Sequence, residues 1–501
     1  MGGHRPPLRH CGTSWRCSSS CPRRRRSGYS PARADQSSHM QPFENSRRDL
    51  AGALAIVESM YRTRHPNSAR QQVLAVKHMP GGNTRSVLYY SPFPLTWASG
   101  EGNRLTDIDG LQYLDLLGEY SAGLYGHSNP IIRAALIRAI EDGLVLGGPN
   151  VYEARLAEAI RARFLSIDLV RFTNSGTEAN LMALSVVRAM RPERSRMVVF
   201  DGSYHGGVFY FRGGSSQLNA PFNWLIGEYN DVEGTRTLLR THAATIAGVI
   251  VEPMLGGGCI PGSREFLNML REECTANDIV LIFDEVMTSR LSPAGMQGLL
   301  DIQPDMTTLG KYLGGGASFG AFGGKHEIME RFDPGRSESF SHAGTFNNNV
   351  LSMAGGVAGL TEVLTPEKIT RTNALGDRLR GRLNEAAVAR GMPFQATGIG
   401  SLIGLHFSSR RIRAGADVAH DAAARVAQVK VETLFHLEML NHGFHLGRRG
   451  YIALSLPTTE ADCNAFVAAV DEFLAAYWPL LEATLSETDM TLVPSRWNVE
   501  G

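Results

Sequence analysis

Short, largely apolar runs recur through the middle of the chain and alternate with longer segments of helical hydrophobic spacing. Between about residues 120 and 370 the clearest runs are residues 170–172, 197–200, 248–251 and 280–283. An apolar run of this length, bounded by polar residues, is typical of a buried strand. Strands that alternate with helices indicate an α/β layer built on a mainly parallel sheet, which we predict for this part of the chain.

The segments on either side of this layer predict a second, smaller domain of the α+β type. Residues 45–65 favour a helix, and residues 66–115 favour an irregular entry with short strands, such as 105–110. The C-terminal part adds helices near 366–390 and 422–441, a strand over 451–456 and a closing helix near 459–484. In chain order we expect an extension over 1–40, an N-terminal segment of the small domain over 41–115, a large domain over 116–370, a C-terminal small domain over 371–485 and a tail over 486–501.

Composition bounds the class of protein. The chain has 501 residues, of which 43% are hydrophobic and 20% are charged, and its formal net charge is +1. This length is sufficient for a large core and two domains. No apolar run approaches the roughly 20 residues that span a bilayer. The overall charge balance gives no reason to expect a nucleic-acid partner, and we expect no metal.

The near-neutral total conceals a basic N-terminus. Residues 1–34 contain eight arginines and no acidic residue, so the remainder carries a formal net charge of −7. This Arg-rich, Ser-rich and acid-poor composition is typical of an organelle transit peptide. The alternatives are a tail that binds nucleic acid or a membrane, a metal site at Cys11, Cys17 and Cys21, and an extension foreign to the natural protein. We favour the extension, with Met40 as the natural start. Zinc is the least favoured, because the cysteine spacing matches no standard pattern.

Three further cysteines, Cys259, Cys274 and Cys463, lie in the body of the chain. So few cysteines in so long a chain do not indicate a disulfide framework. We therefore expect the protein in a reducing compartment, the cytoplasm.

Asp284 and Lys311 form the most informative pair of residues. Asp284 ends an apolar run, so a buried strand would deliver its carboxylate to the C-terminal edge of the sheet. Lys311 follows 27 residues later, close to the glycines 314–316, so a planar ring could approach it. Pyridoxal phosphate requires an amine for a Schiff base and a carboxylate that keeps its pyridine nitrogen protonated. A helix cap at Asp284 and a solvated loop at Lys311 are the alternative interpretations.

Residues 172–180 place a polar turn before a helix of apolar spacing. Ser175 and Glu178 fit the capping box S-x-x-E, which requires no ligand. The N–H groups and hydroxyls of Ser175, Gly176 and Thr177 would also stabilise a phosphate at the helix N-terminus. Gly176 would let the backbone come close to the anion. Both interpretations can hold at once.

Two further segments add weaker candidates. Tyr204 follows the apolar run 197–200 in a Gly-rich loop, where an aromatic ring could stack on a flat cofactor. Residues 341–349 are polar and turn-rich, and Thr345 in this segment could donate to a phosphate. Either segment alone is equally well explained as an ordinary loop.

In their order and spacing, these segments resemble the class III aminotransferases, which are pyridoxal-phosphate enzymes of fold type I. The resemblance covers roughly residues 70–475. Within that family, residues 80–87, 175–180 and 314–324 are most similar to the β-transaminases. The resemblance implies a fold type I transferase with a large domain and a smaller α+β domain, and pyridoxal 5'-phosphate as its cofactor.

The resemblance also assigns roles to the cofactor contacts. Lys311 resembles the Schiff-base lysine, which also moves a proton between substrate and cofactor carbons. Asp284 resembles the partner of the pyridine nitrogen, and Val286 and Tyr204 resemble the contacts on the two ring faces. Thr345 resembles a phosphate ligand contributed by the neighbouring subunit, so a homodimer with shared active sites is expected. The phosphate cup is matched by Ser175, Gly176 and Thr177.

Two arginines complete the resemblance. Arg85, between a Gly-Gly turn and an aromatic stretch, resembles the mobile arginine that binds the carboxylate of a β-amino acid. Arg449 resembles the arginine that holds the α-carboxylate of a keto acid, with Arg448 as an adjacent rival. A planar guanidinium can pair with a carboxylate bidentately. An ordinary surface arginine makes an ion pair worth only about 0–1 kcal/mol.

The implied reaction is transamination of a β-amino acid, aromatic and similar to β-phenylalanine, with 2-oxoglutarate or pyruvate as the acceptor. Rival functions are a glutamate-1-semialdehyde aminomutase, another class III ω-transaminase, and a non-catalytic protein that keeps the fold. Residues 317–319 depart from the Gly-Gly-Gly-Met-Pro-Val-Gly pattern of the aminomutase, which needs no external keto acid. Lys311, Asp284 and the phosphate cup together argue against a non-catalytic protein.

Overall fold

The computed structural model describes residues 49–408, 411–418 and 422–486. The described residues lie in one compact unit, within which the predicted domain boundaries stay predictions. The predicted extension over residues 1–40, with its cysteines, lies outside the described residues, as does the predicted tail beyond Ser486. Within the described ranges, no helix is both long and apolar enough to cross a membrane.

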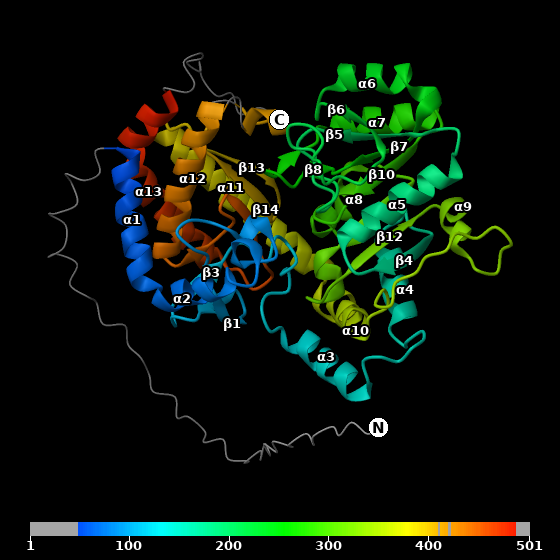
Figure 1. Cartoon of the computed structure of the whole chain (residues 1–501), viewed down its shortest axis with the longest axis horizontal. Helices are drawn as coiled ribbons and strands as arrows, with labels where there is room; N and C mark the ends of the chain where they lie inside the picture. The colour runs from blue at the N-terminus through cyan, green and yellow to red at the C-terminus, as the bar shows by residue number, and fades with distance from the viewer. Residues whose placement is uncertain (1–48, 409–410, 419–421, 487–501) are drawn as a thin grey trace, which may run out of the picture. The chain divides into compact units, whose positions relative to one another are not determined.

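A seven-stranded sheet is the largest in the structure (Figure 1). Its strands are parallel except for β12, which runs antiparallel to both of its neighbours, β11 and β4. In spatial order the strands are β4 (Leu169–Thr173), β12 (Gly320–Gly324), β11 (Met306–Gly310), β10 (Val280–Asp284), β7 (Ile246–Val251), β5 (Arg196–Phe200) and β6 (Asn223–Gly227). The strands predicted for the central layer are all present, and the α/β prediction is confirmed.

Hydrophobic clusters cover both faces of this sheet. Successive side chains of a strand point to opposite faces, so neighbouring residues of one strand belong to different clusters. In β10, Val280 and Ile282 pack in one hydrophobic cluster with α5 (Gly176–Met190), and Leu281 packs in another with α7 (Arg264–Ala276). The other elements of this part of the chain are α3 (Pro130–Asp142), α4 (Glu153–Arg163), α6 (Val232–Thr241), β8 (Met254–Leu255), β9 (Ile260–Pro261), α8 (Gly295–Leu300), α9 (His326–Met329) and α10 (Val350–Ala358). Burial on both faces accounts for the near-continuous apolar runs that predicted the strands.

Both ends of the chain contribute to a further hydrophobic core, as expected for a smaller α+β region. Its helices are α1 (Leu50–Arg64), α2 (Pro66–Ala75), α11 (Pro366–Ala389), α12 (Ala422–Asn441) and α13 (Glu460–Ser486). One of its sheets has the order β1 (Trp97–Glu101), β2 (Arg104–Asp107), β3 (Gln112–Asp115) and β15 (Phe444–His445). The other has the order β13 (Gln395–Ile399), β14 (Leu402–His406) and β16 (Tyr451–Ala453). Because β15 pairs with β3, N-terminal and C-terminal segments share a sheet.

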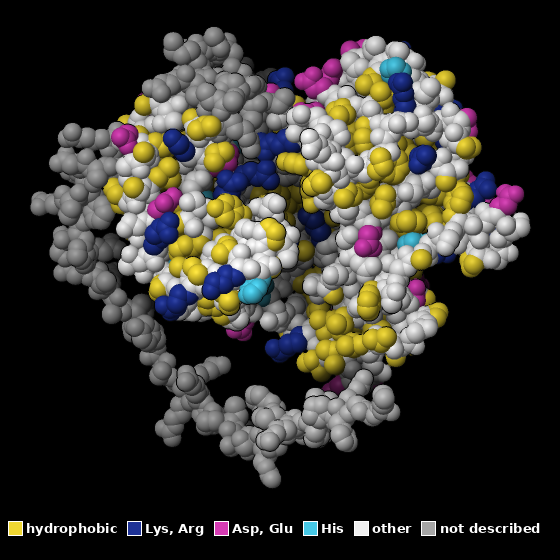
Figure 2. Space-filling model, in the orientation of Figure 1, with side chains coloured by type: hydrophobic (Ala, Val, Ile, Leu, Met, Phe, Trp, Pro, Cys, Tyr) yellow, Lys and Arg dark blue, Asp and Glu magenta, His cyan; other side chains and the backbone are white. Residues whose placement is uncertain are grey.

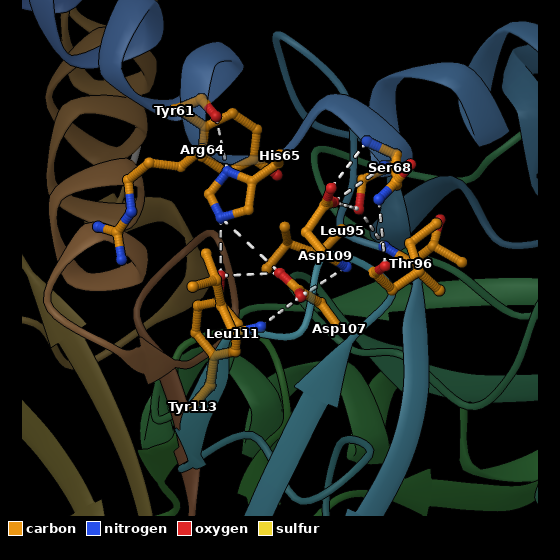
Figure 3. Close-up of polar contacts among 12 residues, drawn as sticks. Tyr61, Arg64, His65, Ser68, Leu95, Thr96, Asp107, Asp109, Leu111 and Tyr113 are labelled. Carbon is orange, nitrogen blue, oxygen red and sulfur yellow. Dashed lines mark hydrogen bonds and ion pairs between the residues drawn. The ribbon is translucent and has the colours of Figure 1, made fainter.

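Helix α2 is a departure from the predicted elements, since residues 66–75 fall in the segment predicted to be irregular. His65, the residue before the helix, provides no side-chain cap. The cap comes from Asp109, whose carboxylate accepts hydrogen bonds from the N–H groups of Asn67 and Ser68 at 2.8 and 3.1 Å (Figure 3). A cap supplied from 41 and 42 positions away leaves no capping side chain before the helix. Pro66 at the first helical position is the local start signal that the prediction did not use.

Two strands are shorter than predicted. The strand expected over residues 105–110 ends at Asp107. The carboxylate of Asp107 accepts a hydrogen bond from the N–H of Asp109 at 2.9 Å and closes a turn there (Figure 3). The strand expected over residues 451–456 ends at Ala453. The helices predicted near 45–65, 366–390, 422–441 and 459–484 are confirmed as α1, α11, α12 and α13.

Candidate active site

Segments that are far apart in the sequence meet at the C-terminal edge of the parallel strands. Asp284 is the last residue of β10, and Lys311 follows the last residue of β11. The two strands are neighbours, with Asp284 opposite Thr308. A Cβ atom at Gly310 would lie 3.6 Å from the Cα atom of Gly176, so the start of α5 lies against the residue before Lys311. Ligand sites of α/β sheets are typically formed at this edge.

Lys311 begins the short turn η5 (Lys311–Gly314) with a left-handed φ of 58°. Non-glycine residues rarely adopt this conformation, and those that do cluster at functional sites. The Nζ atom of Lys311 donates a hydrogen bond to the main-chain oxygen of Tyr120 at 2.5 Å. Burial lowers the pKa of Lys311 to about 8, although Asp284 and Glu252 oppose the shift. Much of the amine is therefore neutral near pH 8, as a nucleophile or proton acceptor must be.

Asp284 is buried, and hydrogen bonds fix both of its carboxylate oxygens. Oδ2 accepts from Nδ2 of Asn180 and from Nδ1 of His205, both at 2.8 Å. Oδ1 accepts from the N–H of Val286 at 3.0 Å. The Oδ1 atom of Asn180 in turn accepts from the hydroxyl of Thr308 at 2.6 Å. Helix α5, strand β11 and the loop after β5 thus hold the carboxylate in one orientation.

Asn180, His205 and Glu252 are site residues to which the sequence patterns assign no role. His205 is buried, and its Nε2 atom has no hydrogen-bond partner in the part of the chain that the structure describes. Burial raises the pKa of Glu252 to about 7. Its carboxylate accepts a hydrogen bond from the N–H of Tyr204 at 2.9 Å. The sequence did contain weak indications of these residues. Glu252 directly follows the apolar run 248–251, Asn180 ends the segment 172–180, and His205 follows Tyr204.

The start of α5 leaves main-chain donors free. The hydroxyl of Ser175 caps the helix by accepting from the N–H of Glu178 at 3.2 Å. The predicted capping box is only half formed, because the Glu178 carboxylate accepts from the N–H of Asn174 at 2.8 Å instead of that of Ser175. Among the described residues, the N–H groups of Gly176 and Thr177 have no hydrogen-bond partner. Free N–H groups at a helix N-terminus bind phosphate well.

Two glycines permit close contacts around this turn. A Cβ atom at Gly176 would lie 2.8 Å from a methyl group of Val286. A Cβ atom at Gly206, whose φ is 124°, would overlap the hydroxyl of Thr177. Any larger residue at either position would therefore displace Val286 or Thr177. Tyr204, the other predicted ring contact, has a side chain that is 52% exposed, so its ring is available to a ligand.

Arg85 lies over the ring of Tyr120, and Arg449 lies two residues before Tyr451, whose ring centroid is 5.6 Å from that of Tyr120. The guanidinium of Arg85 lies over Tyr120, 5.5 Å from the ring centroid, and forms an ion pair with Glu119. Arg449 is exposed in the turn between β15 and β16. Burial raises the pKa of Tyr120, and Arg449 opposes that shift more strongly than Arg85 or Arg448 does. The main-chain oxygen of Tyr120 accepts a hydrogen bond from the Lys311 amine. The guanidinium of Arg85 and the start of β16, next to the turn of Arg449, therefore both lie beside the residue that contacts this amine.

Thr345 is exposed and makes no hydrogen bond to the rest of the described chain. It lies in the segment of residues 341–349, where the side chain of Asn347 accepts a hydrogen bond from that of Asn174 at 3.1 Å. The segment therefore lies beside the residue that precedes the α5 cap. The contribution of Thr345 to the site of a neighbouring subunit stays a prediction.

The residues at this edge fit pyridoxal phosphate. Lys311 supplies an amine of lowered pKa, and Asp284 supplies a carboxylate held in one orientation. The free N–H groups of Gly176 and Thr177 suit a phosphate. A lysine, a buried carboxylate and a helix N-terminus at the edge of a mainly parallel sheet define a pyridoxal-phosphate enzyme of fold type I.

Comparison with known proteins identifies the family. The chain belongs to the class III aminotransferases, since the model "Aminotransferase class-III" matches residues 88–433. The β-phenylalanine transaminase of Variovorax paradoxus is 47% identical over 430 residues, which cover 86% of this chain and 97% of the relative. The crystal structure of a β-phenylalanine aminotransferase from that organism gives a TM-score of 0.83 at 46% identity, covering 86% of this chain and 99% of that one.

Two further relatives agree with this assignment. A glutamate-1-semialdehyde 2,1-aminomutase of Methanopyrus kandleri is 34% identical over 436 residues, which cover 83% of this chain and 98% of the relative. A transaminase solved with PLP bound gives a TM-score of 0.73 at 32% identity, covering 84% of this chain and 99% of that one. This protein is therefore an aminotransferase that uses pyridoxal 5'-phosphate, and the predicted family, fold class, enzyme class and cofactor are confirmed.

Proposed function

We propose that this aminotransferase moves the amino group of a β-amino acid with an aromatic or apolar substituent to 2-oxoglutarate or pyruvate. The observation that carries the proposal is the position of Arg85 over Tyr120, whose main-chain oxygen accepts a hydrogen bond from the Lys311 amine and whose ring also contacts Tyr451, two residues after Arg449. The 47% identity to a β-phenylalanine transaminase supports the same class of substrate.

The shape of a β-amino acid gives a reason for two arginines. Its carboxylate lies one carbon further from the reacting amine than the carboxylate of an α-amino acid. One guanidinium cannot serve donor and acceptor equally well, because bidentate pairing requires a fixed distance and orientation. We assign Arg85 to the carboxylate of the amino donor and Arg449 to the α-carboxylate of the keto acid. Arg448 is the adjacent rival for this second role.

The other residues receive roles from their positions in the site. When bound, pyridoxal phosphate supplies an aldehyde and an electron-withdrawing ring. We assign covalent attachment and proton transfer at the substrate carbon to the Lys311 amine, whose lowered pKa lets it accept a proton near neutral pH. Asp284 would keep the pyridine nitrogen protonated. The phosphate contacts would be Ser175, Gly176 and Thr177, and the ring contacts Val286 and Tyr204.

A homodimer with shared active sites is part of the proposal. Exposed hydrophobic side chains gather over α3 (Figure 2). On this helix and in the segment after it, they are Ile131, Ile137, Ile140, Leu144, Val145, Leu146 and Val151. Val145 and Val151 are 83% and 77% exposed, and apolar patches of this kind mark protein–protein contacts. A second subunit on this surface would cover it, and the exposed Thr345 could then reach the phosphate site of the neighbour.

We also propose the cytoplasm as the compartment. Cys259, Cys274 and Cys463 are buried free thiols, in agreement with the prediction that they form no disulfide framework. Thiols stay reduced in the cytoplasm, whereas secreted proteins tend to form disulfides.

An aminomutase reaction is the second candidate, favoured by the 34% identity to a glutamate-1-semialdehyde aminomutase over most of both chains. The two reactions differ in their need for a keto acid. Purified enzyme mixed with β-phenylalanine should complete a single half-reaction, seen as one change in the absorbance of the cofactor. Further turnover should require the addition of 2-oxoglutarate or pyruvate. Conversion of glutamate-1-semialdehyde without a keto acid, together with no response to β-phenylalanine, would refute the proposal.

A further inference from the structure

Arg85 already has a counter-ion within the chain, the carboxylate of Glu119. The two side chains are 42% and 57% exposed, so water screens their ion pair and the groups can separate at low cost. Under the proposed function, the carboxylate of the amino donor binds the same guanidinium. The donor and Glu119 therefore compete for Arg85.

The backbone around this glutamate is held by contacts that do not involve the arginine. Residues 119–121 have left-handed φ values of 47°, 52° and 76°, which non-glycine residues rarely adopt. On one side, the carboxylate of Asp115 accepts a hydrogen bond from the N–H of Gly118 at 3.0 Å. On the other side, the main-chain oxygen of Ser121 accepts one from the buried guanidinium of Arg290 at 3.4 Å. The backbone at Glu119 is therefore held in place, whereas its ion pair with Arg85 can separate.

Positive charge predominates around this turn. The charged groups that most affect the pKa of the Tyr120 phenol are Arg449, Arg85, Glu119 and Arg448. The hydroxyl of Tyr120 also donates to the main-chain oxygen of Val87 at 3.5 Å, which keeps the arginine-bearing segment close to the turn. Glu119 therefore neutralises the guanidinium of Arg85 in a segment that is held beside the turn.

We propose that Glu119 is a specificity-determining residue that pairs with Arg85 until the carboxylate of an amino donor replaces it. The inference rests on the proposed role of Arg85 in binding that carboxylate. A donor with a carboxylate exchanges one anion for another at the guanidinium. A donor without a carboxylate leaves the ion pair intact, so it does not face an unpaired positive charge. One pocket can thereby accept both kinds of donor, and Glu119 sets the balance between them.

The test is the binding of 3-phenylpropanoate, an aryl carboxylate without an amine, to the cofactor-loaded enzyme by isothermal titration calorimetry. Glu119→Gln should lower its Kd by about two- to five-fold, which corresponds to the loss of a competing exposed ion pair. Glu119→Asp keeps the charge and should lower the Kd less. The uncharged 3-phenylpropanamide should bind wild type and Glu119→Gln equally. Glu101→Gln is the matched control, because Glu101 is exposed at the end of β1 without an ion pair to the described residues, and it should change neither Kd.

A double-mutant cycle separates this inference from the proposed function. Arg85→Gln should weaken binding of 3-phenylpropanoate, and adding Glu119→Gln should then have no effect. If Arg85→Gln weakens binding but Glu119→Gln alone leaves the Kd unchanged, the inference is wrong and the proposed function stands. If Glu119→Gln still lowers the Kd of 3-phenylpropanoate in the Arg85→Gln enzyme, the effect is a general one of charge, and the inference is overturned. An Arg85→Gln enzyme that binds the carboxylate as well as wild type overturns both.

Discussion

Asp284→Asn removes one charge from a carboxylate that accepts three hydrogen bonds. Oδ2 receives two donors, from Asn180 and His205, so the amide oxygen of the new side chain must take that position. The amide nitrogen then faces the N–H of Val286, which requires an acceptor. One hydrogen bond is lost and two donors oppose each other, which lowers the free energy of unfolding by roughly 1–3 kcal/mol.

A loss of this size is smaller than the stability of roughly 5–15 kcal/mol that is typical of folded proteins. The Asp284→Asn enzyme should therefore fold. Under the role proposed for Asp284, catalysis should suffer more, because an uncharged partner would no longer keep the pyridine nitrogen of the cofactor protonated. A hydrogen bond to a charged group contributes about 1.5–3 kcal/mol. Its loss predicts a donor half-reaction that is about 10- to 150-fold slower.

Single-turnover absorbance measurements with β-phenylalanine give the rate of that half-reaction, and urea unfolding followed by circular dichroism gives the stability. Asp301→Asn is the matched control, because Asp301 is exposed at the C-terminal end of α8 and has no ion pair to the described residues. It should change neither quantity. Near-normal turnover of Asp284→Asn with full cofactor occupancy would refute the role of Asp284. A variant that cannot fold would refute the reasoning from its hydrogen bonds.

Borohydride reduction followed by peptide mass analysis should find the cofactor fixed to Lys311, and its presence on another lysine would contradict the site. Arg85→Ala should slow the half-reaction of the β-amino donor far more than that of the keto acid, and Arg449→Ala should do the reverse. Single-turnover spectra measure both half-reactions, and equal losses would argue against two carboxylate positions. Deletion of residues 1–39 should leave solubility and activity intact, because this polar, Arg-rich stretch has too little apolar content to join a core. An insoluble or cofactor-free product would disprove this. Burial raises the pKa of Glu252 from 4.5 to about 7, so the folded state binds this proton more tightly than the unfolded chain does. This carboxyl therefore makes stability fall as the pH rises from 4.5 to about 7. Glu252→Gln should flatten that fall in urea unfolding, and an unchanged pH profile would count against the shift.

The strands that carry the site were predictable, because a strand buried on both faces is apolar along its whole length. That pattern located Asp284 at the end of β10, and the turn before an amphipathic helix located Ser175. The partners of Asp284 were not predictable in the same way. Asn180 and His205 lie 104 and 79 positions from it in the chain. Hydrogen bonds over such separations leave no periodic signal, as with the distant cap of α2.

The residues that would choose the substrate lie outside the sheet that positions Lys311, the proposed attachment site of the cofactor. Arg85 and Glu119 come from loops, and they are partly exposed where the lysine's neighbours are buried. An exposed ion pair contributes only about 0–1 kcal/mol to the free energy of unfolding. Leaving a buried donor or acceptor without a partner costs more, roughly 1–3 kcal/mol. Changes at Arg85 or Glu119 should therefore alter which donor binds without altering the urea midpoint, whereas changes at Asp284 should slow the half-reaction and lower the urea midpoint. A family built on one cofactor site can acquire new donors most readily at such exposed pairs, because substitutions there leave the buried hydrogen bonds around Asp284 in place.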